Sequence, residues 1–234
     1  MSNLPDRPAA ATGAVADFLR AVERLPQARP AGRPGRLLFA VDATASRQPS
    51  WDRACHLQGE MFLATRDLGG LAVQLAYYRG FGEFAATPFL TDAAELARRM
   101  SGVRCLGGRT QIESVLRHAL NETARDRVHA AVFVGDAVEE QVDLLCHLAG
   151  QLGLRGTPVF AFHEGSDAAA GEALRQIARL SGGAYVPFDS ASAETLRALL
   201  RAVAVFAAGG RAALGRLSGP VARHIAGQLP APGR

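Results

Sequence analysis

The sequence predicts an α/β fold: a doubly wound, mostly parallel, Rossmann-like sheet flanked by helices, with one antiparallel edge strand. Short uninterrupted apolar runs recur along the chain, for example at 37–41 and 130–134, and such runs are typical of strands buried on both faces of a parallel sheet. Stretches with the apolar spacing of helices separate these runs, as the crossovers of a parallel sheet require. Two of the runs lead into aspartates, Asp42 and Asp136, so both carboxylates are expected at one edge of the sheet.

Six strands are expected, each an apolar run bounded by turn residues. In chain order they lie at 37–41, 71–78, 81–89, 130–136, 157–163 and 184–188. The third follows the second after a glycine-rich turn, which predicts a hairpin at the edge of the sheet.

Helices are expected where apolar residues recur at intervals of three and four positions. They lie at 51–67, 92–100, 112–120, 139–152, 167–180 and 193–206. Gly69 and Gly70 end the first helix, and Thr91 or Asp92 caps the second. A glycine-rich loop before the third helix places Thr110 at its start.

A chain of 234 residues, 48% of them hydrophobic, can bury one sizeable core. Residues 36–208 are expected to form this single domain. Prolines are dense in residues 1–35, which we interpret as an N-terminal arm or linker with a short helix near 13–25. Residues 209–234, with several glycines and a PAPGR end, are expected to form a loosely attached C-terminal tail.

The composition excludes several classes of function. All 26 basic residues are arginine, so the chain lacks the lysine that phosphate-binding loops and Schiff-base enzymes need. The net charge is +4, but the 22 acidic residues are interspersed with the basic ones, and no run of like charge indicates nucleic-acid binding.

The sequence also predicts where the protein works. Three cysteines without a C-x-x-C spacing favour a reducing compartment over a disulfide framework or a zinc ribbon. The sequence shows no secretory signal and no uninterrupted apolar segment long enough to span a membrane. We therefore expect a cytoplasmic protein with no membrane partner.

Candidate metal ligands begin where the first strand ends. Asp42, Thr44 and Ser46 alternate, so in an extended or tightly turning loop their side-chain oxygens can converge on one point. These are hard oxygen donors, which magnesium and calcium prefer, whereas zinc or copper would favour histidine and cysteine. A solvated strand-to-helix turn in which Ser46 caps the helix is the alternative interpretation of this pattern.

Two further segments bring oxygen donors to the same edge of the expected sheet. Thr110 follows the glycine-rich loop, and Asp136 follows the strand at 130–135. Two carboxylates and three hydroxyls are a plausible partial shell for an octahedral magnesium ion, which commonly keeps positions for water or an incoming ligand.

With these residues the chain resembles the von Willebrand factor A (VWA) domain family, in its bacterial cytoplasmic type. The metal-ion-dependent adhesion site (MIDAS) of that family combines a D-x-S-x-S motif, a distant threonine after a glycine-rich loop, and an aspartate after a later strand. The corresponding segments here are DATAS, GGRTQI and VFVGD, in the family's order. Thr44 stands where the family usually has serine, which keeps the oxygen and adds a methyl group, and the last loop reads Gly-Asp-Ala where Thr-Asp-Gly is usual.

The resemblance implies a protein-binding module rather than an enzyme. Asp42, Thr44, Ser46, Thr110 and Asp136 would bind Mg²⁺, or Mn²⁺ or Ca²⁺, directly or through water. A carboxylate of a partner protein would then complete the metal shell, with no bond broken. Bacterial domains of this kind often act beside AAA-type ATPases or chaperone systems, so the resemblance suggests such a partner.

Other residues near the motifs have less specific interpretations. Arg109 adjoins Thr110 and is a candidate to clamp the partner's carboxylate, although a solvated loop arginine is the favoured interpretation. Glu139 and Glu140 either line the rim of the site or favour the start of their own helix through its dipole, and we prefer the dipole interpretation.

Two other functions remain open. A haloacid-dehalogenase-like, magnesium-dependent phosphatase also begins with an apolar strand and a D-x-[DT]-x-[TS] motif, with Asp42 as nucleophile and Asp136 as a metal ligand. That family uses a lysine, which is missing here, and Thr44 would replace its acid/base residue. A scaffold that has lost its metal is the other alternative. A Rossmann dinucleotide site is disfavoured, because the turn after Asp42 lacks the glycines it needs.

Overall fold

The computed structural model describes residues 33–188 and 193–230. The described residues up to Leu229 form one compact unit. The expected N-terminal arm and its helix near 13–25 lie outside the described residues, except for positions 33–35.

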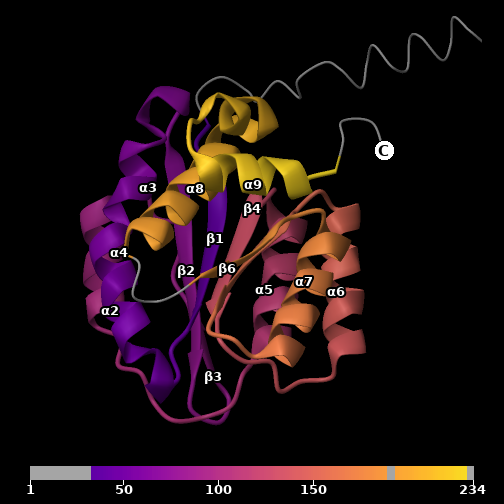
Figure 1. Ribbon diagram of the computed structural model, residues 1–234. Coiled ribbons are helices and arrows are strands. Elements are labelled where there is room, and N and C mark those ends of the chain that lie inside the picture. Colours follow the sequence, from indigo (N-terminus) through magenta and orange to yellow (C-terminus); the bar gives the residue numbers. More distant parts are fainter. Residues whose placement is uncertain (1–32, 189–192, 231–234) are drawn as a thin grey trace, which may run out of the picture. The chain divides into compact units, whose positions relative to one another are not determined.

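A six-stranded sheet in the order β3-β2-β1-β4-β5-β6 forms the centre of the unit (Figure 1). The strands are β1 Gly35–Asp42, β2 Leu71–Arg79, β3 Glu83–Ala86, β4 Ala130–Gly135, β5 Val159–Glu164 and β6 Tyr185–Phe188. Five strands are parallel, and β3 pairs with β2 in the antiparallel direction at the edge. The predicted fold class, with its antiparallel edge hairpin, is therefore confirmed.

The strand order reverses at β1. The chain runs from β1 outward to β2 and β3, then returns to the other side of β1 to form β4, β5 and β6. In open α/β sheets the crevice at such a reversal, beyond the carboxyl ends of the strands, is where ligands bind. Asp42 is the last residue of β1, and Asp136 directly follows β4, so both stand at this crevice.

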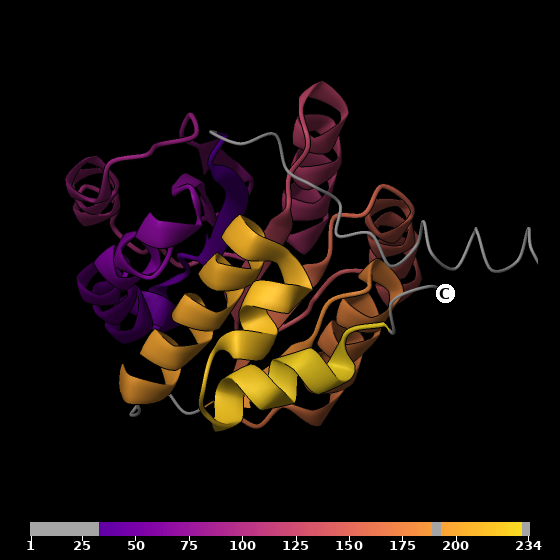
Figure 2. The same ribbon diagram turned by 90° about the horizontal axis from the view of Figure 1, so that it is seen from above.

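Helices cover both faces of the sheet. They are α2 Gln48–Leu57, α3 Gly59–Leu63, α4 Ala93–Ser101, α5 Ile112–Arg125, α6 Val142–Leu154, α7 Ala168–Ser181, α8 Ala193–Arg216 and α9 Pro220–Gln228, with short 3₁₀ turns η1 Ala45–Arg47 and η2 Arg66–Leu68. Side chains of α2, α3, α4, α8 and α9 pack on one face, and those of α5, α6 and α7 pack on the other. Figure 2 shows α8 and α5 on opposite sides of the strands.

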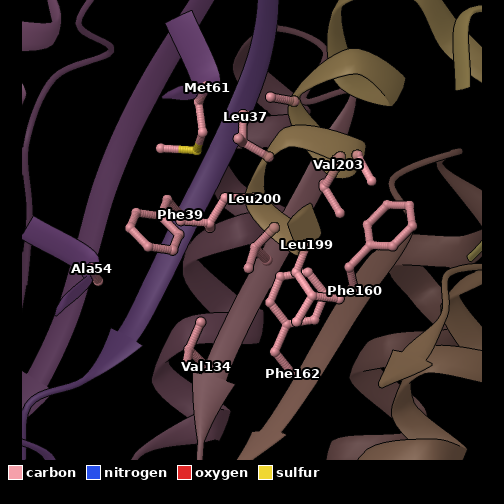
Figure 3. Close-up of a cluster of buried hydrophobic side chains, with 14 of the residues drawn as sticks. Leu37, Phe39, Ala54, Met61, Val134, Phe160, Phe162, Leu199, Leu200 and Val203 are labelled. Atoms are coloured by element: carbon pink, nitrogen blue, oxygen red, sulfur yellow. The ribbon is translucent and has the colours of Figure 1, made fainter. Parts of the chain in front are cut away.

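The strand pleat divides the core into two layers. In β1, Leu37, Phe39 and Val41 belong to the layer under α8, whereas Leu38 and Ala40 belong to the layer under α5. Figure 3 shows the first layer, where Leu199, Leu200 and Val203 of α8 meet Phe160 and Phe162 of β5. By length and composition α8 could cross a membrane, yet 56% of its most apolar window is buried inside the protein, as in the core helix of a globular domain.

The domain continues beyond the expected boundary at Ala208. Helix α8 kinks at Gly210 and continues to Arg216, and α9 packs on the same layer. Leu214, Ile225 and Leu229 are all buried there. Residues 209–229 therefore belong to the compact unit rather than to a loosely attached tail.

Two expected helices have different bounds in the structure. The helix expected at 51–67 begins earlier and divides into α2 and α3 on either side of Gln58, next to Gly59, a poor helix former. The helix expected from Glu139 begins only at Val142, because Glu139 and Glu140 bind Thr110 in the loop before α5, and Glu140 also binds the first amides of α5.

Candidate metal site

Asp42 is the buried carboxylate of the site. It lies at the end of β1 with no exposed surface, in register with Tyr78 of β2. Its Oδ1 atom accepts a hydrogen bond from the Thr44 amide at 2.7 Å. Its Oδ2 atom and the hydroxyl of Tyr78 make no well-aligned hydrogen bond within the described part of the chain, although this hydroxyl lies near enough to lower the pKa of Asp42. A buried carboxylate oxygen without a well-aligned donor is costly, so a cation or a bound water at Oδ2 would stabilise Asp42.

The electrostatics of Asp42 agree with this geometry. Burial raises the pKa of its carboxyl group above the usual value, and the nearby charge of Asp136 raises it further. Hydrogen bonds from Thr44 act in the opposite direction and lower this pKa. The charge of Asp136 thus acts on the Asp42 carboxyl group from the end of the neighbouring strand β4.

Ser46 binds one of these two carboxylates. Its Oγ atom donates to Oδ2 of Asp136 at 3.4 Å, across 90 positions of sequence. Ser46 lies within the short turn η1, and neither η1 nor α2 has a side-chain capping hydrogen bond at its N-terminus. The capping interpretation of Ser46 is therefore wrong, and the side chain points toward Asp136 instead.

Arg47 is a component of this site that the sequence did not reveal. Its guanidinium group is buried, with the residue 4% exposed. Nη1 lies 3.5 Å from Oδ2 of Asp136, and Nη2 forms an ion pair with Glu164 at the end of β5. Glu164 also accepts a hydrogen bond from the Ser50 hydroxyl at 2.7 Å. The only clue in the sequence was the position of Arg47 directly after Ser46.

The loop that carries Thr110 is fastened to neighbouring loops. The amide of Leu106 donates to the Ala43 carbonyl at 3.0 Å, and the amide of Arg109 donates to the Gly80 carbonyl at 3.2 Å. Gly108 lies so close to Gly80 that a Cβ atom there would collide with the Gly80 carbonyl group. A glycine is therefore required at this position, and the contact fixes where the loop delivers Thr110.

Thr110 is held by the two glutamates that follow β4. Its hydroxyl donates to Oε2 of Glu140 at 2.6 Å and accepts from the amide of Glu139 at 2.9 Å. Its own amide donates to Oε2 of Glu139 at 2.7 Å. A hydroxyl has two acceptor lone pairs, so one lone pair of Thr110 is left for a further ligand.

Glu140 also caps the start of α5. Its Oε1 atom accepts from the amide of Ile112 and, at 3.2 Å, from the amide of Glu113. These are amides of the first helical turn, which have no partner inside the helix. Glu139 and Glu140 therefore line the rim of the site. Glu140 stabilises the start of α5, whereas the dipole interpretation had assigned both glutamates to the start of their own helix.

The structure brings some of the five expected ligands together more closely than others. Asp42, Ser46 and Asp136 form one cluster, and Thr44, 9% exposed, supports Asp42 from the adjacent turn. Thr110 lies at the same end of the sheet, since its loop is hydrogen-bonded to Ala43, the residue after Asp42, and to Gly80.

Arg109 is exposed at the rim beside Thr110. Among residues 33–188 and 193–230, its guanidinium group makes no hydrogen bond or ion pair that the structure defines, whereas its backbone anchors the loop on Gly80. The side chain is therefore available for a ligand that approaches the crevice.

The donor set fits a hard divalent cation better than a transition metal. In the described ranges, no group of three or more histidine, cysteine, aspartate and glutamate side chains is arranged to hold a metal ion. The cluster instead offers two carboxylates, Asp42 and Asp136, with the hydroxyls of Ser46, Thr44 and Thr110. Magnesium accepts such a lean set because it retains several waters.

No known protein family and no curated protein matches the sequence. Solved structures do match the fold. The VWA domain of SpRpn10 has a TM-score of 0.54 and 12% identity, with 68% of this chain and 89% of that chain covered. An aerotolerance-related membrane protein from Bacteroides fragilis has a TM-score of 0.53 and 16% identity, with 69% and 94% covered.

A third similar structure is proximal thread matrix protein 1 from the mussel byssus, described with a zinc-occupied MIDAS motif. Its TM-score is 0.52 and its identity 18%, with 74% of this chain and 46% of that chain covered. Sequence identities this low establish the fold alone. The chain is thus an α/β protein whose strand order reverses at β1, and its fold is that of VWA domains.

Proposed function

We propose that this protein is a divalent-metal-dependent interaction module that binds an acidic side chain of a partner protein. The observation that carries the proposal is the fully buried carboxylate of Asp42, whose Oδ2 atom has no well-aligned donor, beside Ser46 and Asp136. Asp42, Thr44, Ser46, Thr110 and Asp136 would hold the ion. Mg²⁺ is the expected metal, with Mn²⁺ and Ca²⁺ as substitutes. When bound, the cation supplies a positive centre that a carboxylate of the partner can reach.

The rim of the crevice supports a protein partner. Phe81, in the turn between β2 and β3, is 85% exposed, and Leu106 is 42% exposed. The hydrogen bond from Arg109 to Gly80 joins the two loops that carry these side chains. Large apolar side chains beside a charged centre are typical of protein-binding surfaces.

Similar structures agree with a role in protein assembly. Besides the SpRpn10 VWA domain, they include the human COPII-coat protein Sec24c, with a TM-score of 0.55 and 12% identity, and with 78% of this chain and 33% of that chain covered. For the present chain we propose a cytoplasmic protein partner, with an AAA-type ATPase or a chaperone system as the first candidates.

The hydrogen bonds of the acidic groups support a non-catalytic role. Glu139 and Glu140 both accept hydrogen bonds from Thr110 or from helix amides, so neither is free to act as a general base. The phosphatase alternative places Asp42 as nucleophile, yet Thr44 cannot serve as its acid/base partner and no lysine exists in the chain.

Calorimetric titration with MgCl₂ and MnCl₂ tests the metal site. The wild type is compared with Asp42→Asn/Asp136→Asn, which removes both charges with little change of shape. Asp67→Asn/Asp143→Asn, at two exposed positions, is the matched control. Saturable binding in the wild type and control that disappears in the first variant supports the site. Equal binding by all three proteins, or by none, contradicts it.

A second experiment separates binding from hydrolysis. Partners captured from a cell extract with Mg²⁺ and with EDTA are compared for the wild type and Asp42→Asn, while hydrolysis of p-nitrophenyl phosphate is measured on the same proteins. Capture that needs both the metal and Asp42, without phosphate release, supports the interaction module. Metal-dependent phosphate release that Asp42→Asn abolishes would instead establish the phosphatase.

A further inference from the structure

Arg47 places a fixed positive charge inside the proposed metal site. Its residue is 4% exposed, and Glu164, its ion-pair partner, is 7% exposed. Ser50 donates a second hydrogen bond to the same carboxylate at 2.7 Å. Glu164 therefore holds one side of the guanidinium firmly, and the other side faces Asp136.

The contact between Arg47 and Asp136 is looser. The Nη1 to Oδ2 distance is 3.5 Å, and the side chain of Asp136 is 30% exposed compared with 9% for Glu164. The Nε atom of Arg47 is buried and has no hydrogen-bond partner within the described part of the chain. The guanidinium position is thus determined mainly by Glu164, and Asp136 is a carboxylate that a second cation can recruit.

We propose that Arg47 sets how strongly this site binds a divalent cation, because its charge already neutralises Asp136 and repels a second positive ion nearby. This inference rests on the proposed metal-dependent function. A buried charge acts more strongly than an exposed one, since water and salt screen it less. Glu164 opposes the effect of Arg47, because its negative charge partly cancels that of the guanidinium group.

The two members of the pair should therefore act in opposite directions. Arg47→Gln removes the competing charge, so we expect Mg²⁺ and Mn²⁺ to bind tighter by on the order of tenfold. Glu164→Gln leaves the arginine without its counter-ion, so we expect binding weaker by on the order of threefold, a smaller change because it is Arg47 that contacts Asp136. Arg47→Gln/Glu164→Gln removes both charges, and its affinity should exceed that of the wild type, because Asp136 loses its neighbour.

The measurement is the Mn²⁺ and Mg²⁺ dissociation constant, by calorimetry and by the electron paramagnetic resonance signal of free Mn²⁺. Arg117→Gln, which breaks an exposed ion pair with Glu113, is the matched control and should bind as the wild type does. Circular dichroism verifies folding. If a single variant fails to fold because it leaves a buried charge unpaired, Arg47→Gln/Glu164→Gln carries the test.

The outcomes separate this inference from the proposed function. Equal affinities of the wild type, Arg47→Gln and the double variant overturn the role of Arg47 and leave the metal site intact. Metal binding by the Arg47 variants alone supports the inference and shows that the arginine closes the wild-type site. Absence of binding in every protein overturns both.

Discussion

The buried carboxylate of Asp42 is the central candidate metal ligand, and it lowers the stability of the metal-free protein. Its carboxyl group is fully buried, one oxygen has no well-aligned donor, and the charge of Asp136 lies nearby. Because burial raises the pKa of Asp42, the metal-free native state favours the protonated acid more than the unfolded chain does. The stability from this preference is fully present at low pH and is lost as pH rises through the raised pKa.

Asp42→Asn should therefore stabilise the metal-free protein at neutral pH. The amide carries no charge, and its oxygen can still accept from the Thr44 amide. We expect a gain in unfolding free energy, because burial no longer penalises a charged group at this position. Urea denaturation in EDTA measures it, and the gain should shrink on acidification toward the usual pKa of 3.8, where the wild-type acid is also neutral. A variant less stable than the wild type at neutral pH would contradict this account.

At the scale of elements, three loops build the crevice by holding one another. The turn after β1, the turn between β2 and β3, and the loop before α5 are joined through the Ala43 and Gly80 carbonyls. Each loop begins at the end of a helix or strand, and the hydrogen bonds between the loops fix the positions of the side chains that they carry. The position of Thr110 therefore depends on the fit between loops as well as on its own sequence.

Gly108→Ala tests this fit against Gly107→Ala. A Cβ atom at Gly108 collides with backbone atoms of Gly80, whereas a Cβ atom at Gly107 has nothing within 4 Å. We expect Gly108→Ala to cost about 1–3 kcal/mol and to weaken metal binding, because the loop carrying Thr110 must move. Gly107→Ala should stay within about 0.5 kcal/mol. Thermal denaturation and metal titration check both, and equal behaviour of the two variants would refute the contact.

Glu140 links the loop after β4 to the start of α5. Glu140→Ala removes the acceptor of the Thr110 hydroxyl and of two helix amides. We expect a loss of about 1–2 kcal/mol in unfolding free energy, as for a lost helix cap. Glu172→Ala, in an exposed ion pair on α7, is the comparison and should cost less than about 0.5 kcal/mol. Equal denaturant midpoints for the two variants would show that Glu140 does not stabilise α5.

At the scale of the whole molecule, the C-terminal helices complete one of the two core layers. Ile225 of α9 has no exposed surface and belongs to the layer that covers β1. We expect Ile225→Ala to cost about 2–5 kcal/mol, as for other buried branched side chains. Leu154→Ala, at a position 91% exposed, should change stability by less than about 0.5 kcal/mol. Equal denaturation midpoints for Ile225→Ala and Leu154→Ala would show that residues 209–229 do not stabilise the domain.

The sequence by itself determined the order of the elements and the place of two carboxylates. Strand and helix periodicities are local properties, so apolar runs and helical spacing predicted every strand of the sheet, including the antiparallel edge. The residues that follow parallel strands lie at the same edge of the sheet, which is why the sequence predicts that Asp42 and Asp136 share one edge. The helix bounds were less accurate where capping partners came from other elements.

Only the tertiary structure decided the environment of those carboxylates. Arg47 and Glu164 are 117 positions apart, and Thr110 and Glu140 are 30 apart, so neither pairing is visible in local sequence patterns. Burial and the packing of separate loops determine which charge faces Asp136 and which helix Glu140 caps. The extent of the domain was also decided by tertiary packing. The glycines around Gly210 predicted a tail, whereas the apolar side chains beyond them are buried in the core.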